Sequence, residues 1–154
     1  MHKDFMIRAI ELSAQSVESG GGPFGSVIVK DGQIIAESAN RVTIDNDPTA
    51  HAEVNAIRLA CQKLQTYSLE GCEIYTSCEP CPMCLAAIYW ARIGKIYFAN
   101  TKNDAAAIGF DDSFIYHEIQ LPHDKRSISI QPFMRDEAWK VFKKWEEKED
   151  KREY

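Results

Sequence analysis

Residues 76–84, TSCEPCPMC, decide the fold, and a short run upstream, residues 49–53 (TAHAE), complements them. Cys81 and Cys84 are two residues apart and precede a helix-like run at residues 85–91, LAAIYWA. A Cys-x-x-Cys at the first turn of a helix can place two sulfurs around one metal ion. The helix N-terminus also favours thiolate, because its free N–H groups and dipole stabilise negative charge. The pattern therefore predicts a metal site at the start of a helix.

His51 and Glu53 supply the remaining groups of this predicted site. Pro48 precedes them and favours a helix start, from which both side chains can reach a site beyond the helix end. Two cysteines and one histidine leave one of the four zinc positions open, which is typical of a catalytic zinc. Zinc lowers the pKa of a bound water to about 7, and a nearby carboxylate can move the proton. We predict one Zn²⁺ per subunit on His51, Cys81 and Cys84, with Glu53 catalytic.

Two other uses of the cysteines are open. A Cys-x-x-Cys can be a redox pair, but the His-x-Glu run upstream disfavours that use. A closed structural zinc needs a fourth ligand, for which Cys78 is the near candidate, although it lies on the strand side of Pro80. Neither use accounts for Glu53.

Length and composition indicate a single domain, residues 1–154, with a sizeable core. There is no apolar run near ~20 residues and no signal-peptide core, so we expect no membrane association. Cys61, Cys72 and Cys78 are left over as buried free thiols, which suits a reducing cytosol. We therefore expect a cytoplasmic protein.

The net charge is -5, with basic and acidic residues interspersed. A protein that grips a phosphate backbone usually has a basic face. The charge therefore disfavours a nucleic acid partner and favours a small-molecule substrate.

The periodicity of the chain predicts an α/β fold. The expected elements are a helix over residues 5–17, strands at 24–29 and 34–39 joined by the turn KDGQ, a helix at 49–64, a strand at 72–76, the helix after the cysteines and a strand at 95–99. Such strand-helix-strand crossovers normally give parallel strands in a sheet covered on both faces.

The last third of the chain is less regular. Residues 105–109 predict a short helix that ends at Gly109. Residues 127–133 alternate like an edge strand, and apolar positions between 134 and 145 form the stripe of a docking helix. A charged tail follows and ends in Tyr154.

The runs HAE at residues 51–53 and PCPMC at 80–84 resemble the signature of the cytidine and deoxycytidylate deaminase superfamily. The resemblance implies a three-layer α/β/α sandwich with a central mixed sheet and zinc between the two helices that carry its ligands. Residues 22–25 (GPFG), 109–116 (GFDDSFIY) and 151–154 (KREY) resemble the bacterial guanine deaminases of that superfamily, and the likeness covers nearly the whole chain.

The resemblance to guanine deaminases implies hydrolysis of guanine to xanthine and ammonia. It makes Asp112 a second catalytic carboxylate, which relays a proton to the leaving amine, and puts Asn40 on the edge of the base. A plainer role is open for each: Asp112 can cap a helix that begins near Ser113, and Asn40 can be a turn residue at a strand end.

The same resemblance assigns aromatic residues to the substrate site. Phe24, Trp90 and Phe110 would flank the flat faces of the base, although Trp90 and Phe110 can also be ordinary core residues. The C-terminal segment, about 134–154, would dock on or be swapped with a partner subunit, so that Tyr154 reaches a site across a homodimer. The plainer expectation for Tyr154 is a disordered terminus.

Rival functions remain within and outside this class. A guanosine or cytosine deaminase would use the same zinc chemistry. A tRNA adenosine deaminase shares both motifs, but the acidic balance disfavours it. A zinc-stabilised module without turnover would have no use for an open metal position or for Glu53.

Overall fold

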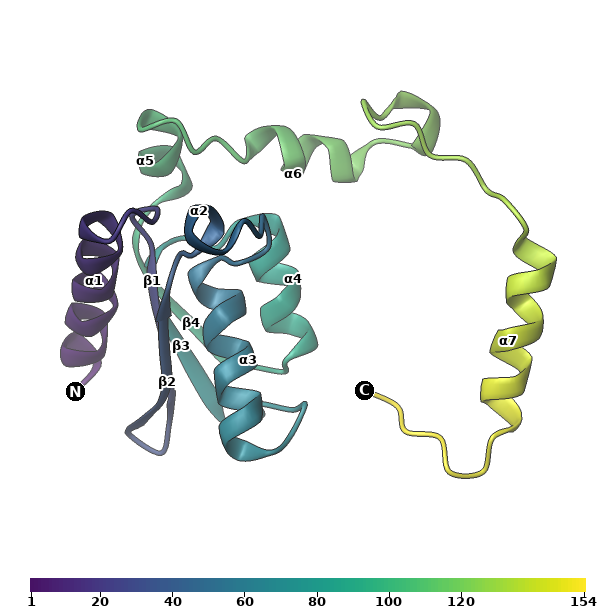
Figure 1. Cartoon of the computed structure of the whole chain (residues 1–154), viewed down its shortest axis with the longest axis horizontal. Coiled ribbons are helices and arrows are strands. Elements are labelled where there is room, and N and C mark those ends of the chain that lie inside the picture. Colours follow the sequence, from purple (N-terminus) through teal and green to yellow (C-terminus); the bar gives the residue numbers. More distant parts are fainter. The chain divides into compact units, whose positions relative to one another are not determined.

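A four-stranded mixed sheet lies at the centre of the first of two compact units, Met1–Asp112 and Ser113–Tyr154 (Figure 1). The computed structural model describes all residues from 1 to 154. The strands are β1 (Gly25–Lys30), β2 (Gln33–Ala39), β3 (Cys72–Cys78) and β4 (Lys95–Asn100), in the order β2-β1-β3-β4.

The turn between β1 and β2 follows directly from the sequence. Lys30 pairs with Gln33, and between them Asp31 has φ 50° and Gly32 has φ 74°. A two-residue type I′ turn needs positive φ at both central positions, which Asp-Gly provides. The predicted hairpin is confirmed.

The order of the strands differs from a simple series of parallel neighbours. β3 pairs with β1 in antiparallel fashion and with β4 in parallel fashion. β2 and β3 run in the same direction, as their helical connection predicts, but the chain crosses over β1 and the two strands are not neighbours. The only parallel pair is therefore β3 with β4, and the sheet is mixed.

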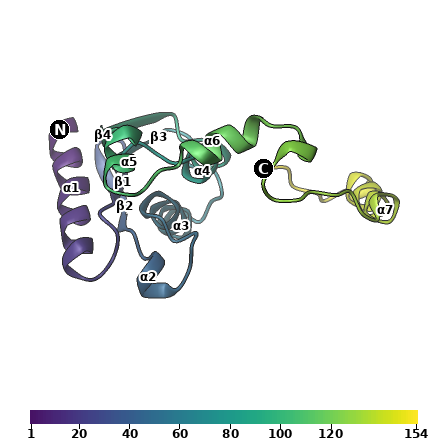
Figure 2. The ribbon, with the colours of Figure 1, turned by 90° about the horizontal axis from the view of Figure 1, so that it is seen from above.

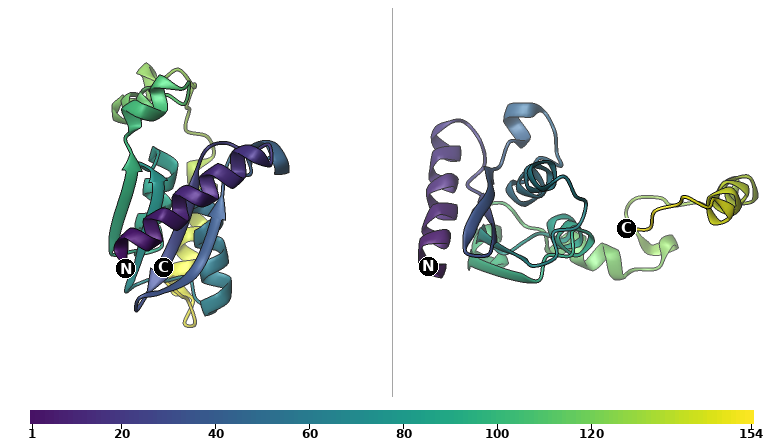
Figure 3. Two further views of the ribbon diagram at one scale, coloured as in Figure 1. Left: turned by 90° about the vertical axis from the view of Figure 1, so that its left-hand side faces the viewer. Right: turned by 90° about the horizontal axis from the view of Figure 1, so that it is seen from below.

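Helices cover both faces of the sheet, which confirms the three-layer sandwich (Figure 2). On one face, α1 (His2–Glu18) runs obliquely across the strands, and its Ala9 and Leu12 join a core cluster with Val27, Val29 and Tyr75 (Figure 3). On the other face lie α3 (Ala52–Leu64) and α4 (Pro82–Trp90). Their apolar residues pack with those of the strands into a second cluster, Ile28, Ala36, Ala56, Ala60, Leu69, Cys72, Ile74, Ile88 and Ala91.

Two contacts hold α1 against the sheet. A Cβ atom added at Gly25 would lie 2.2 Å from the carbonyl oxygen of Ala9 and 2.7 Å from the backbone nitrogen of Ser13, so only glycine allows this approach. Arg8 donates two hydrogen bonds to Glu37 on β2, with Nε 2.9 Å from Oε2 and Nη2 2.5 Å from Oε1.

Smaller helices complete the first unit. α2 (Val42–Asp45) is a single turn in the connection between β2 and α3. α5 (Lys102–Ala107) begins at a Thr101 capping box, and Gly109 follows with φ 98°, close to the predicted stop. No helix in the protein combines the length and apolar character that crossing a membrane requires.

The second unit contains α6 (Ser113–Gln120), the 3₁₀ turn η1 (His123–Lys125) and α7 (Arg135–Glu147). The helix expected from residue 134 is therefore present. The edge strand expected at residues 127–133 is wrong: this segment forms no strand. Alternating side chains do not suffice, because a strand also needs a neighbour to pair with its N–H and C=O groups.

Candidate metal centre and active site

Three side chains with metal-binding atoms meet between the starts of α3 and α4. His51 is the N-cap of α3, Cys81 is the N-cap of α4, and Cys84 follows in the first turn of α4. The Nδ1 atom of His51 is 3.5 Å from each cysteine sulfur, and the three ligand atoms lie within 4.8 Å of one another. Ligand atoms around a tetrahedral zinc are about 3.5–3.8 Å apart, so this group fits the ion.

The local sequence explains why the two helices begin here. Pro82 occupies the first turn of α4, where its missing N–H has no helical partner to lose. Both N-caps have extended backbone, with ψ 155° at His51 and ψ 169° at Cys81. The positive ends of both helix dipoles therefore face the sulfurs and favour thiolate.

The pKa values of the two cysteine thiols are shifted in opposite directions. The hydrogen bond between them lowers the pKa of Cys81, which the neighbouring His51 lowers further. The same hydrogen bond, together with burial, raises the pKa of Cys84. Cysteine sulfur together with imidazole nitrogen is the donor set that suits zinc.

Glu53 lies beside this group, in the first turn of α3 and only 6% exposed. Its Oε1 atom accepts a hydrogen bond from the hydroxyl of Thr76 on β3, at 3.2 Å. Burial raises the pKa of the Glu53 carboxyl. A carboxyl group whose pKa moves toward neutrality is better suited to accept and return a proton at physiological pH.

Asn40 follows β2 and is also buried. Its side-chain Oδ1 atom accepts hydrogen bonds from the backbone N–H groups of Gly22, at 3.4 Å, and Val42, at 3.2 Å. These two bonds fix the orientation of the amide and leave its NH₂ group available to a ligand.

Phe24, Phe110 and Asp112 are further predicted residues of the first unit. The rings of Phe24 and Phe110 meet edge to face, with centroids 5.0 Å apart. Asp112 is half-buried, and its pKa is raised by burial and by the nearby charge of Cys81. Asp112 therefore lies within electrostatic reach of the metal-binding group.

The sheet explains how these residues come to the same edge. Phe24 precedes β1 and Asn40 follows β2, and the adjacent residues Gly25 and Ala39 are paired. Ser26 pairs with Thr76 near the end of β3, beyond which the cysteine loop begins. Strand pairing therefore brings together segments that are up to about 50 residues apart.

Trp90 and Tyr154 are placed differently. Trp90 is the last residue of α4 and is 67% exposed. At 1.5 Å per residue it lies about 13 Å along the helix from Cys81. Within its own chain Trp90 is therefore at the far end of α4, and its substrate contact stays a prediction that a second subunit would have to fulfil. Tyr154 belongs to the second unit.

Sequence reasoning missed two residues that support the site. Thr76 donates a hydrogen bond to Glu53. The alternation of side chains along the strand at residues 72–76 could have indicated that Thr76 faces the same side of the sheet as Ile74 and therefore faces α3. Asn55 donates from Nδ2 to the carbonyl oxygens of Ala39, at 3.0 Å, and Ala50, at 3.2 Å. No sequence pattern indicates this link between the segments that carry Asn40 and His51.

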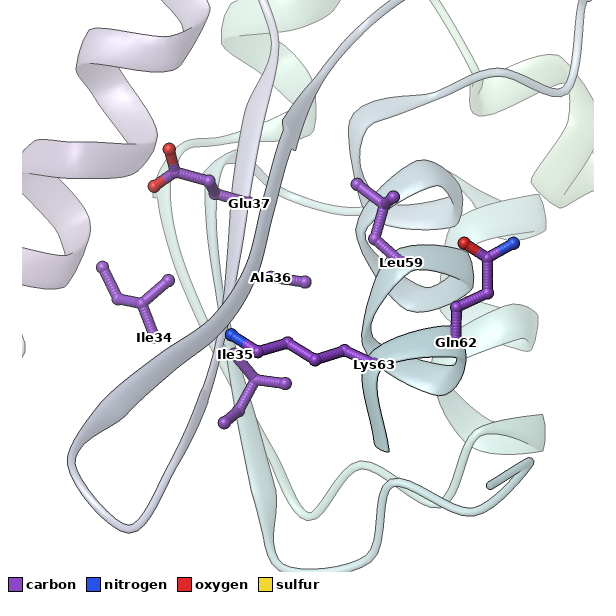
Figure 4. A pocket seen from close by; sticks show the side chains of 7 residues that line it. All are labelled: Ile34, Ile35, Ala36, Glu37, Leu59, Gln62 and Lys63. Carbon is purple, nitrogen blue, oxygen red and sulfur yellow. The ribbon is translucent and has the colours of Figure 1, made fainter. Parts of the chain in front are cut away.

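A separate hollow of about 580 Å³ lies between β2 and the second half of α3 (Figure 4). Its lining includes Ala36, Glu37, Leu59 and Lys63, and the Glu37 carboxylate is turned toward α1, where Arg8 donates hydrogen bonds to it. Leu59 is eight residues beyond His51, about 12 Å along the helix. The hollow is therefore distinct from the metal-binding group.

Comparison with known proteins gives the family. Residues 1–100 match the cytidine and deoxycytidylate deaminase zinc-binding region. The chain is 54% identical to the guanine deaminase of Bacillus subtilis over 154 residues, 99% of each chain. A crystal structure of that guanine deaminase superposes with a TM-score of 0.97 and covers 100% of this chain and 99% of its own.

Two other relatives share mainly the first part of the chain. A tRNA-specific adenosine deaminase of Aquifex aeolicus is 44% identical over 100 residues, 64% of this chain and 66% of its own. The protein NE0047, solved in complex with 2,6-diaminopurine, is 36% identical, with a TM-score of 0.68 over 70% of this chain and 61% of its own. The zinc-binding motif, the His-Cys-Cys cluster and these similarities together identify the chain as a member of the cytidine and deoxycytidylate deaminase zinc-binding family.

Proposed function

We propose that this protein is a zinc-dependent guanine deaminase, which hydrolyses guanine to xanthine and ammonia. The observation that carries the proposal is the 54% identity to a guanine deaminase across 99% of both chains. The tRNA adenosine deaminase relative, in contrast, matches over 64% of this chain. The net charge of -5 also favours a small base over a polynucleotide.

His51, Cys81 and Cys84 would hold the zinc ion. When bound, zinc supplies a Lewis acid that makes water nucleophilic near neutral pH. In the reaction, a carbon–oxygen bond forms at the ring carbon that carries the amine, and the carbon–nitrogen bond to that amine breaks. Glu53 takes a proton from the attacking water and delivers it to a ring nitrogen, for which its burial beside the metal ligands suits it.

The remaining groups bind and orient the base. The NH₂ group of Asn40 donates to an acceptor on the purine edge, because its oxygen is already held by Gly22 and Val42. Phe24 and Phe110 contribute apolar ring surface for the planar base. Asp112, half-buried and with a raised pKa, relays the proton of the newly attached hydroxyl group to the departing amine, which leaves as ammonia.

We further propose that the C-terminal segment, about 134–154, docks on or is exchanged with a second copy of the chain in a homodimer. α7 supports this proposal because it has a strongly amphipathic sequence and yet no buried side chain. Its exposed apolar side chains, Trp139, Val141, Phe142 and Trp145, need a surface to cover them. Trp90 and Tyr154 would then contact the purine base in a site to which both subunits contribute.

A substrate panel tests the activity. Zinc-loaded protein is assayed for ammonia release from guanine, guanosine, cytosine, cytidine and adenine. Rapid release from guanine alone is the expected result. Release from guanosine instead would require a pocket with room for ribose, and no release from any of the five would refute the proposal.

Truncation tests the role of the tail. Deleting residues 151–154 should lower turnover of guanine without loss of zinc, because it removes the tail that we propose closes the substrate site and leaves the metal ligands intact. Unchanged turnover would show that the tail does not close the site, and the mass in solution measured by light scattering tests the dimer directly.

A further inference from the structure

We propose that Thr76 is a positioning residue for deamination: its buried hydroxyl holds the carboxylate of Glu53 in the orientation that proton transfer requires. The inference rests on the proposed function, because the proton transferred is that of the deamination step. It concerns a residue outside the metal-binding and base-binding groups described above.

Thr76 is held rigidly by its surroundings. It is 1% exposed and lies on β3, which has neighbours on both sides: Ser26 of β1 and Phe98 of β4 are its pairing partners. Its branched Cβ restricts χ1 to few rotamers. The Thr76 hydroxyl therefore has a fixed position relative to the sheet.

Glu53 needs such an anchor. It comes from the helical layer, and the terminal torsion of a glutamate side chain is broad and only weakly restricted by its own structure. The hydrogen bond from Thr76 Oγ1 to Oε1, at 3.2 Å, joins the helix to the sheet. This bond anchors Oε1 on the sheet and so limits the positions that the rest of the carboxylate can take.

The neighbouring hydroxyl on β3 cannot take over this role. Ser77 faces the opposite side of the sheet, where its Oγ atom accepts a hydrogen bond from the backbone N–H of Gly25, at 3.0 Å. Thr76 is thus the one hydroxyl of β3 that faces the metal side of the sheet.

A simpler account is that Thr76 is a buried hydroxyl that uses Glu53 only to satisfy its own hydrogen bond. Thr76→Val separates the accounts, because valine keeps the shape and removes the hydroxyl. Thr76→Ser is the matched variant, since it keeps the hydroxyl and removes only the methyl group.

The first experiment measures zinc content, KM and kcat for guanine in both variants. Thr76→Val should keep one zinc per chain and a KM within about twofold, while kcat falls about 10- to 100-fold, the range expected for loss of a hydrogen bond to a charged group. Thr76→Ser should retain at least about a third of wild-type kcat, because its hydroxyl restores the bond. Wild-type kcat in Thr76→Val, or an equal loss in both variants, would overturn the proposal.

The second experiment tests the contact between Thr76 and Glu53 through protein stability, independently of catalytic activity. Thermal unfolding of the zinc-loaded protein is compared for Thr76→Val in the wild-type and Glu53→Ala backgrounds. We expect the substitution to lower Tm by about 3–12 °C in the wild type, the shift that corresponds to loss of a hydrogen bond to a charged group. In Glu53→Ala it should leave Tm unchanged or raise it, because the hydroxyl has lost its acceptor.

The two readouts distinguish the proposals from each other. Equal Tm shifts in both backgrounds would mean that Thr76 and Glu53 are not coupled, and the positioning role would be refuted. If the Tm shift differs between the wild-type and Glu53→Ala backgrounds but the wild type does not deaminate guanine, the proposed function is refuted, while the coupling between Thr76 and Glu53 is still supported. Differing Tm shifts with a normal kcat in Thr76→Val would overturn the positioning role alone.

Discussion

Asn40→Asp is the most informative substitution in the proposed base site, because it changes one group and keeps the shape. The Oδ1 atom of Asn40 accepts from the backbone N–H groups of Gly22 and Val42, and a carboxylate oxygen can accept the same two bonds. The NH₂ group, however, becomes a second oxygen. The loop should therefore fold as before, while the donor to the purine edge is lost.

The size of the effect follows from the burial of this side chain, which is 7% exposed. A buried polar group left without its partner costs about 1–3 kcal/mol, equivalent to about 5- to 150-fold in kcat/KM. The new oxygen also faces an acceptor of the base with its own lone pairs, so the upper half of this range is expected. Tm should not fall, because both backbone N–H groups keep their acceptor.

The assay measures xanthine formation, with zinc content and Tm determined on the same preparations. Asn103→Asp is the matched control, since it makes the same chemical change at an exposed position of α5 and should leave kcat/KM unchanged. A kcat/KM within about twofold of wild type in Asn40→Asp, with intact protein, would refute the assigned role of the NH₂ group.

Three further predictions concern catalysis and stability. Glu53→Gln should retain zinc and lose kcat by at least about 100-fold, the usual contribution of a general base, and near-normal turnover would exclude that role. Gly25→Ala should lower Tm, because its Cβ would lie 2.2 Å from a backbone oxygen of α1, whereas Gly94→Ala, with its nearest atom at 3.8 Å, should not. The Arg8 guanidinium lowers the pKa of Glu37 below its ordinary value, so the stability advantage of wild type over Glu37→Gln should be present at neutral pH and be lost as the pH falls through that lowered pKa. Urea unfolding of both proteins at several pH values measures this difference in stability. A stability advantage of wild type that grows in acid would contradict a lowered pKa of Glu37.

Much of the chemistry is local enough to be predicted from the sequence. The runs at residues 51–53 and 80–84 specify the types of metal ligand. Pro48 and Pro82 favour helix starts beside these runs and so place the ligands at the N-termini of two helices. The Asp-Gly pair predicts its turn, because few residue pairs tolerate positive φ at both central positions. The helical periods of α1, α3 and α7 are likewise set by short-range spacing.

Contacts between distant segments were decided only by the tertiary structure. The alternation at residues 127–133 predicted a strand, but pairing requires a partner that the sequence pattern does not specify. Trp90 belongs to the helix of the metal ligands, yet helix length carries it about 13 Å from Cys81.

The sequence by itself determined which groups can bind zinc and move protons, since these are properties of residue types at short spacing. The tertiary structure decided how those groups are oriented. The hydrogen bond from Thr76 to Glu53 and the held amide of Asn40 both depend on strand pairing and helix packing. Orientation depends on partners far away in the chain, and local sequence does not determine which partners will meet.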